Sequence, residues 1–154
     1  MTDRVIRLQE APFDYGAECA AFAERAGGAG AVVTFLGLVR NDGGSLTRME
    51  IDHYPGMTEA AIDAIAAEAA TRFRLDSLLV LHRTGPMQPG EPIMMVATAS
   101  RHRAEAFAAA EFLMDYLKSR APFWKKEHRA EGPIWVAARD ADEEALDRWA
   151  GGAG

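Results

Sequence analysis

The sequence predicts an α+β fold, with a largely antiparallel sheet packed on helices. Short runs of β-branched and aromatic residues alternate with longer Ala-rich segments of helical character. Some of the short runs follow one another with only a turn between them, which favours hairpins and antiparallel pairing. The chain has 154 residues, shows no internal repeat and has no low-complexity linker. We therefore expect a single domain over residues 1–150, followed by a flexible tail at residues 151–154.

The first elements are a short strand and a helix. A strand is expected over Arg4–Leu8, where apolar residues dominate. The next segment predicts a helix over Ala17–Ala26, because Asp14 is a good N-cap and the Gly27-Gly28 pair ends the helical pattern.

Two strands and a tight turn are expected next. Ala31–Val39 is rich in β-branched and aromatic residues and predicts a buried strand. The segment Asn41–Ser45 reads NDGGS, a strong turn signal. Arg48–Tyr54 alternates apolar and polar positions, so we expect it to return as the second strand of a hairpin.

The middle of the chain predicts a long helix and a second strand pair. Thr58 is the expected cap of an Ala-rich helix that continues to about Arg74. Ser77–His82 and Pro92–Ala99 then predict two strands, joined by the Gly- and Pro-rich segment TGPMQPGEP.

The last third predicts a helix, a strand and a short helix. Ser100 is the expected cap of a helix over Arg101–Arg120, which Pro122 stops. Ile134–Ala138 predicts a short strand. A terminal helix is expected to begin at Asp140 or Asp142, before a GGAG end.

Composition excludes several classes of protein. The net charge of −6 argues against a general nucleic-acid binder. No apolar run reaches the ~20 residues of a membrane span, and the N-terminus lacks a signal-peptide pattern. Cys19 is the only cysteine, so neither an internal disulfide nor a thiolate metal cluster is expected. These features predict a cytoplasmic protein that binds neither membrane nor nucleic acid and needs no metal or cofactor.

Lysine is confined to one window of the chain. The sequence holds 17 Lys and Arg residues, and the lysines among them are Lys118, Lys125 and Lys126. Arginine stays charged in proteins, whereas lysine can shift its pKa and act as a base or a nucleophile. The window is therefore a candidate for amine chemistry, and the simpler alternative is a solvated basic patch.

A basic cluster stands at the predicted start of the helix over Arg101–Arg120. Free backbone N–H groups at a helix N-terminus already favour an anion, and His102 and Arg103 would add to a phosphate or carboxylate site. Lys118 lies about 22 Å farther along such a helix, at about 1.5 Å per residue. A metabolite cannot touch both ends. Either there are two sites, or one site is assembled from two chains of a homodimer.

The aromatic pair Phe123 and Trp124 lies beside these lysines. It would anchor the chain reversal after Pro122, and it could also exclude water from a nearby amine and lower the pKa of that amine.

Other residues carry weaker signals. A lone Arg40 at a strand end is more often surface than site. His53 falls on the apolar phase of its strand and is interpreted as a core or interface histidine, while His82 is given no role. The glycines at 27, 28 and 30 precede a strand, which is the wrong context for a phosphate loop.

Several motifs together resemble a known family. They are VVTFLGLVRN, HYPGMTE, HRTG with a following PGE, RHRAEAF, MDYLKSRAPFWKKE and EGPIWVAARD. These segments resemble the large, catalytic subunits of molybdopterin synthase over about Ala31–Trp149. The departures, in TGPMQPGE and in the short NDGGS turn, lie outside the motifs.

The resemblance implies an α/β-hammerhead fold and a sulfurtransferase activity in molybdenum cofactor biosynthesis. Such an enzyme converts cyclic pyranopterin monophosphate (precursor Z) to molybdopterin. Its sulfur arrives as a thiocarboxylate on the C-terminal Gly-Gly of a small ubiquitin-like subunit. Two large subunits would form a central homodimer within a heterotetramer.

The resemblance also implies a set of site residues. The catalytic pair would be Lys118 and Lys125. The substrate-binding residues would be Phe35, Leu38, Val39, Arg40, His102, Arg103, Met114, Lys126, Glu127 and Arg139.

Two alternatives remain open from the residues themselves. One is a non-catalytic module whose basic patch docks an acidic protein or a nucleotide ligand, with steep salt dependence. The other is a Schiff-base enzyme that uses Lys118.

Overall fold

The computed structural model describes residues 2–136 and 140–150, and its mixed helices and strands confirm the α+β class. The described strands form two sheets of four strands each. We call these the main sheet and the small sheet. Within the described residues, no helix is both long enough and apolar enough to cross a membrane.

The main sheet has the strand order β1-β4-β6-β2. Its members are β1 (Asp3–Gln9), β2 (Ala31–Leu38), β4 (Ser77–Arg83) and β6 (Pro92–Ser100). Pairing is antiparallel except between β1 and β4, which run parallel. Every residue of β4 is buried because helices cover both faces of this sheet.

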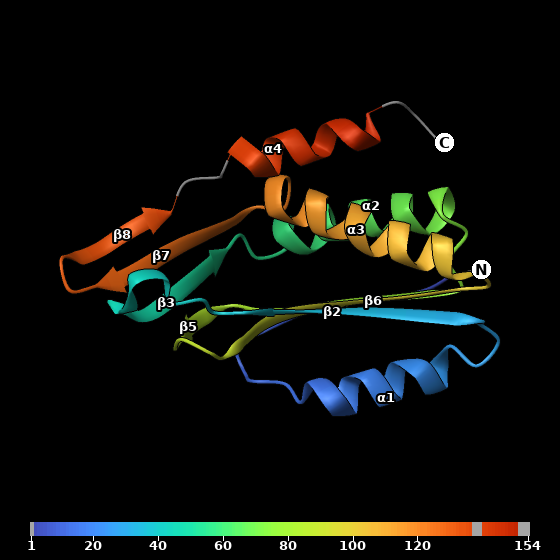
Figure 1. Cartoon of the computed structure of the whole chain (residues 1–154), viewed down its shortest axis with the longest axis horizontal. Coiled ribbons are helices and arrows are strands. Elements are labelled where there is room, and N and C mark those ends of the chain that lie inside the picture. The colour runs from blue at the N-terminus through green and yellow to red at the C-terminus, as the bar shows by residue number, and fades with distance from the viewer. Residues whose placement is uncertain (1, 137–139, 151–154) are drawn as a thin grey trace.

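Three helices make the main sheet the middle layer of a sandwich. Figure 1 shows α1 (Tyr15–Arg25) on one face, and α2 (Met57–Arg72) with α3 (Arg103–Ser119) on the other. Successive residues of β4 point to opposite faces of the sheet and so belong to two hydrophobic cores. Leu78 and Val80 pack with α2 and α3, while Leu79 and Leu81 pack with Phe22 of α1.

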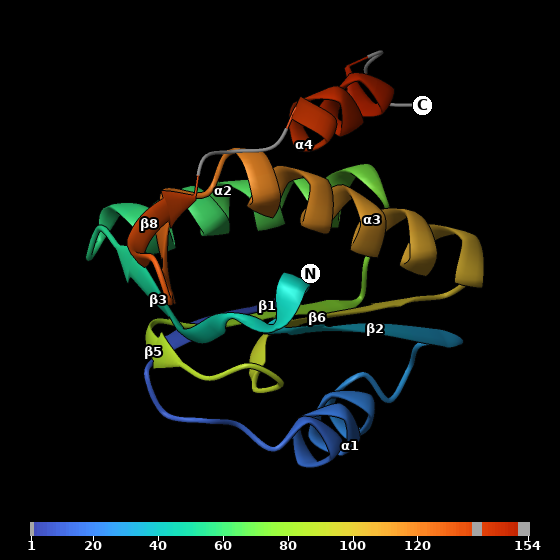
Figure 2. The same ribbon diagram turned by 60° about the vertical axis from the view of Figure 1, so that its left-hand side comes forward.

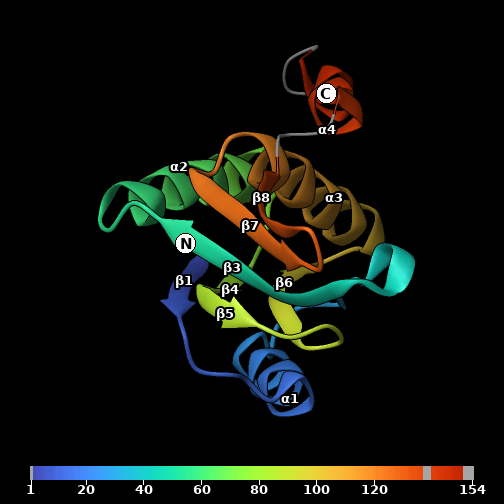
Figure 3. The same ribbon diagram turned by 90° about the vertical axis from the view of Figure 1, so that its left-hand side faces the viewer.

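The small sheet is antiparallel and has the order β5-β3-β7-β8. Its members are β3 (Leu46–His53), β5 (Gly85–Met87), β7 (Phe123–Arg129) and β8 (Gly132–Val136). It lies across one end of the molecule and faces the viewer in Figure 3. Met49, Ile51 and Met87 bury its inner face against Val39.

The predicted hairpin between 31–39 and 48–54 is wrong. Both strands exist, but β2 pairs with β6 in the main sheet, and β3 pairs with β5 and β7 in the small sheet. The NDGGS segment makes a 3₁₀ turn at Asp42–Gly44, with Gly43 and Gly44 at positive φ. The turn therefore moves the chain from one sheet to the other instead of closing a hairpin.

Of the three helix N-caps predicted from the sequence, one is confirmed and two are wrong. The side chain of Asp14 accepts a hydrogen bond from the Ala17 N–H, as expected. α2 already begins at Met57 after Gly56, and the buried Thr58 hydroxyl instead donates to the Pro122 carbonyl. α3 begins after His102, and the Ser100 hydroxyl donates to the Arg74 carbonyl.

The C-terminal segment lies over the outer side of α3 (Figure 2). It contains α4 (Asp140–Leu146) and a 3₁₀ turn at Asp147–Trp149. The Trp149 indole N–H donates to Asp115 of α3 at 2.6 Å, and its ring packs edge-on against Phe112. Of the predicted strand at 134–138, residues 134–136 belong to β8 (Gly132–Val136), and residues 137 and 138 lie outside the described residues, as does the expected tail at 151–154.

Candidate functional site

A cavity of about 740 Å³ lies where the small sheet meets the main sheet, at the C-terminal end of α3. The end of β2, the start of β6, the end of α3 and β7 all contribute to its wall. Eight of the residues that the sequence singled out line this cavity. They are Phe35, Leu38, Val39, Arg40, Met114, Lys118, Lys125 and Glu127.

Strand alternation decides which lysines face the cavity. Successive residues of a strand point to opposite faces, so Lys125 and Glu127 line the cavity while Lys126 points away. The Lys126 ammonium instead lies 5.3 Å from the centre of the Trp135 ring of β8. Within one chain, the neighbours Lys125 and Lys126 therefore serve different surfaces.

Lys125 is the lysine whose charge is disfavoured. The pKa of its amine is lowered from 10.5 to about 8, mainly by burial and in part by the positive charge of Lys118, while Asp142 and Glu127 oppose the shift. The neutral amine is therefore easier to form near neutral pH than in an ordinary lysine. Lys118, on the last turn of α3, is exposed at the cavity.

The rest of the wall combines apolar surface with a few charges. Phe35, Met94 and Met114 provide a flat, polarisable lining, and the Phe35 side chain is 41% exposed. The Glu127 carboxylate accepts a hydrogen bond from Arg129 at 3.2 Å. Asp142 of α4 also reaches the wall, so the C-terminal segment helps to form the site.

His82 is a cavity residue that sequence reasoning missed. It is the next-to-last residue of β4, is 6% exposed and stacks on Phe123 of β7 at 4.0 Å between ring centres. The sequence contained one usable signal, because His82 has the same strand parity as the apolar Leu78 and Val80 and so had to point into the protein.

Two predicted residues lie at the opposite end of α3 from the cavity. His102 precedes the first turn and Arg103 begins it, and both are exposed. Over 17 residues of helix this separation is about 24 Å. Arg139, also predicted for the site, lies outside the described residues.

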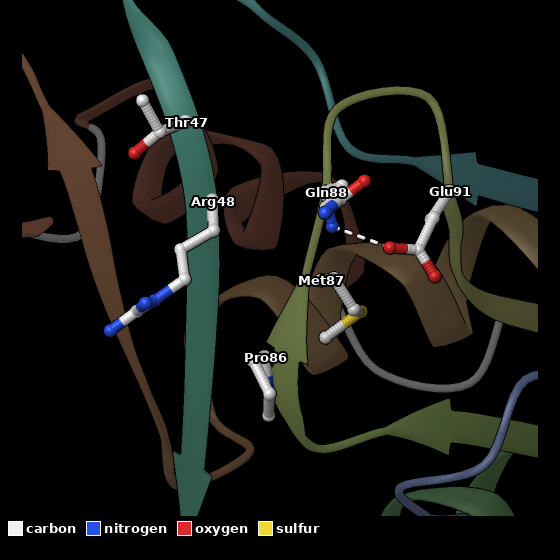
Figure 4. Close-up of a pocket in the computed structure, with 6 residues that line it drawn as sticks. All are labelled: Thr47, Arg48, Pro86, Met87, Gln88 and Glu91. Atoms are coloured by element: carbon white, nitrogen blue, oxygen red, sulfur yellow. Dashed lines mark hydrogen bonds between the residues drawn. The ribbon is translucent and has the colours of Figure 1, made fainter.

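A second, smaller depression lies between β3 and the segment formed by β5 and the loop that follows it (Figure 4). It measures about 400 Å³ and is lined by Thr47, Arg48, Pro86, Met87, Gln88 and Glu91. Arg48 is paired with Glu50, and Glu91 is paired with the buried Arg83 and with the Gln88 backbone N–H. Its charged groups already have partners, so the larger cavity is the better candidate.

The fold and the cavity together define an α+β protein with a paired-lysine site suited to acid–base work on an anionic ligand. Comparison with known proteins identifies the family. Residues 8–120 match the MoaE protein family, and the chain belongs to that family.

Similar proteins carry consistent names. The chain is 66% identical over 144 residues to the molybdopterin synthase catalytic subunit of Cereibacter sphaeroides, covering 94% of this chain and 99% of that one. It is 48% identical to the molybdopterin biosynthesis MoaE protein of Burkholderia ambifaria, with a TM-score of 0.80 and coverage of 95% and 98%. A molybdopterin synthase structure from Staphylococcus aureus is 27% identical, with a TM-score of 0.76 and coverage of 84% and 95%.

Proposed function

We propose that this chain is the catalytic subunit of a molybdopterin synthase. It would convert cyclic pyranopterin monophosphate to molybdopterin, using sulfur from the C-terminal thiocarboxylate of a small ubiquitin-like subunit. The observation that carries the proposal is the pairing of Lys118 and the low-pKa Lys125 in one cavity. The names of close relatives support the same activity.

The reaction requires two kinds of help that a lysine pair can supply. The thiocarboxylate sulfur first bonds to a carbon of the pyranopterin and displaces an oxygen from that carbon, which leaves as water or as the oxygen of an opened phosphate ester. The carrier is then attached through a thioester. Water then attacks the thioester carbonyl, releasing the carrier as a carboxylate and leaving the sulfur on the pterin. The water must lose a proton, and the oxygen of the tetrahedral intermediate must be stabilised as it becomes negative.

We assign these two tasks to different lysines. A neutral Lys125 amine would accept the proton from the attacking water, because its pKa of about 8 lies near the operating pH. Lys118, exposed at the cavity, would donate an N–H to the developing oxyanion and then give a proton to the leaving sulfur, while Lys125 keeps the proton taken from water.

Other lining residues would bind the substrate and the carrier tail. Phe35 and Met114 offer a surface for the flat pterin, and Arg40 offers a positive charge for its phosphate. Leu38, 52% exposed beside the cavity, would contact the tail of the carrier.

The proposed oligomer is based on the length of α3, which separates His102 and Arg103 from the cavity of the same chain. His102 and Arg103 would reach a cavity only in a second copy of the chain, so we propose a homodimer at the centre of a heterotetramer with two small subunits. We further propose that this assembly works in the cytoplasm.

A single-turnover assay tests the activity. Purified chain, cyclic pyranopterin monophosphate and thiocarboxylated small subunit are mixed without oxygen, and the product is followed as its fluorescent oxidised derivative. Wild type should form product, and Lys118→Ala should lose about 10²–10³ in rate while remaining folded. Lys118→Arg should be nearly as damaging, because its charge is kept but its proton cannot be given up.

The alternatives predict different outcomes. Full activity in Lys118→Arg would mean that Lys118 contributes only its positive charge and gives up no proton. No product from a folded wild type with bound carrier would favour a non-catalytic docking module. Trapping of Lys118 by borohydride with a carbonyl substrate would favour a Schiff-base enzyme.

A further inference from the structure

His82 joins the two sheets at the base of the cavity. It is the next-to-last residue of β4 in the main sheet, and its ring stacks on Phe123 of the small sheet with 17° between the ring planes. Phe123 and Lys125 are two residues apart on β7, so their side chains lie on the same face as neighbours. His82, Phe123 and Lys125 all line the cavity.

A single hydrogen bond fixes the orientation of the imidazole. The Nδ1 atom lies 2.7 Å from the backbone carbonyl oxygen of Arg83. A carbonyl can only accept, so Nδ1 carries the hydrogen and Nε2 keeps the free lone pair. The ring therefore has a defined tautomer as well as a defined plane.

The surroundings of this imidazole keep it uncharged. Burial lowers the pKa of His82 from 6.5 to about 4, and the hydrogen bond to Arg83 opposes this shift. The charges of Lys125, Lys118 and His53, which face the ring from β7, α3 and β3, also lower it. At neutral pH His82 therefore carries no charge that could repel a protonated lysine.

We propose that His82 is a positioning residue for Lys125: its neutral ring, stacked on Phe123, closes the cavity wall beside the amine and keeps water from it. The ring acts through Lys125 and does not itself exchange a proton in the reaction. The expected effect of His82 on turnover rests on the proposed function. Its effect on Lys125 can be measured without any substrate.

Two substitutions separate the stacked ring from the hydrogen bond. His82→Asn keeps a donor that can reach the Arg83 carbonyl but loses the ring, so water should gain access to Lys125. His82→Phe keeps the stacked ring but loses the donor. The proposal expects Asn to disturb Lys125 and Phe to leave it little changed, although Phe removes the hydrogen bond and should lower the melting temperature more.

The direct measurement is the titration of Lys125 in the full-length chain by NMR of isotope-labelled lysine. The chain has three lysines, so the signals can be assigned by substitution. In His82→Asn the Lys125 pKa should rise by about one unit towards its ordinary value, because less of the amine's hydration is lost. In His82→Phe it should stay near 8. His128→Asn is the matched control, because His128 lies on the opposite face of β7 from Lys125.

The kinetic consequence is a shifted pH profile. With a Lys125 pKa raised by one unit, His82→Asn should turn over about tenfold more slowly at pH 7 and recover at higher pH, with little change in KM. His82→Gln replaces Asn if the shorter amide does not fold.

Three results would overturn the inference. An unchanged Lys125 titration in His82→Asn would leave His82 as a structural residue alone. Equal shifts in the Asn and Phe variants would indicate general loosening of the cavity. A uniform loss of rate at every pH would show that the ring does not act through Lys125. Absence of turnover in wild type would instead count against the proposed function, since the titration does not depend on it.

Discussion

At the scale of single residues, the pKa of Lys125 sets the expected pH dependence. Folding lowers this pKa from 10.5 to about 8, so the folded protein favours the neutral amine. If the neutral amine is the base, turnover should rise about tenfold per pH unit below pH 8 and level off above it. Single-turnover rates between pH 6 and 9 test this. A rate that falls over the same range would make Lys125 an acid.

The same shift bears on stability with a definite sign. Below about pH 8 the folded chain must hold a protonated, partly buried Lys125, which costs free energy that the unfolded chain does not spend. This cost disappears as the pH rises from 8 towards 10.5. The burial that lowers the pKa of Lys125 therefore also destabilises the folded chain, a combination that is common at functional sites.

Gly30 shows a different constraint at this scale. A Cβ placed there would collide with the backbone carbonyl of Arg101, which lies two residues before α3 begins. Gly30→Ala should cost about 1–3 kcal/mol of unfolding free energy, measured by denaturant titration, because backbone must move to admit the methyl group. Gly28→Ala is the control, since nothing lies within 4 Å of its Cβ position. Equal stability of the two variants would contradict the steric explanation.

At the scale of elements, β7 separates two adjacent lysines by strand parity. Lys125 lines the cavity, while Lys126 lies over Trp135 on the outer face of the small sheet. Lys125→Ala should lower the single-turnover rate by about 10²–10³, and Lys126→Ala by less than about threefold, since the Lys126 ammonium points away from the cavity. Comparable losses would mean that the outer face also contacts substrate, which would then have to reach it from a second chain.

The same strand shows where sequence reasoning fails for elements. FWKKEHR carries four charged side chains in seven residues and reads as a solvated patch, yet it pairs on both sides with β3 and β8. Its inner face, with Lys125 and Glu127, forms part of the cavity wall. A strand that carries polar residues on the face lining a cavity lacks the apolar alternation by which strands are recognised in a sequence, so this strand was not predicted.

Long-range pairing is the other element-level failure. Local patterns placed the strands at 31–39 and 48–54 correctly, as they did the four main helices to within a few residues. They could not reveal that the intervening turn moves the chain between sheets, because β2 finds its partner β6 about sixty residues away. His82 was missed for the same reason, since its stacking partner Phe123 belongs to another sheet.

At the scale of the whole molecule, the two ends of α3 define the central question. The cavity has Lys118 at the C-terminal end, and His102 and Arg103 lie at the N-terminal end, about 24 Å away. The sequence placed all of them in one site through family resemblance. Within one chain the cavity residues lie together, but His102 and Arg103 do not lie near them. A site that contains all the residues implied by the resemblance would therefore need two chains.

Subunit mixing provides the decisive experiment. Lys118→Ala and a His102→Ala/Arg103→Ala variant are each expected to be nearly inactive alone. In a mixed dimer with shared sites, one site carries both defects and the other carries none. Because half of the randomly assembled dimers are mixed, about a quarter of the wild-type sites should return. Single-turnover amplitude after co-refolding measures this fraction. If each site belonged to one chain, every site would retain a defect and no activity would return, whereas a quarter of the wild-type amplitude requires that α3 of one subunit complete the cavity of the other.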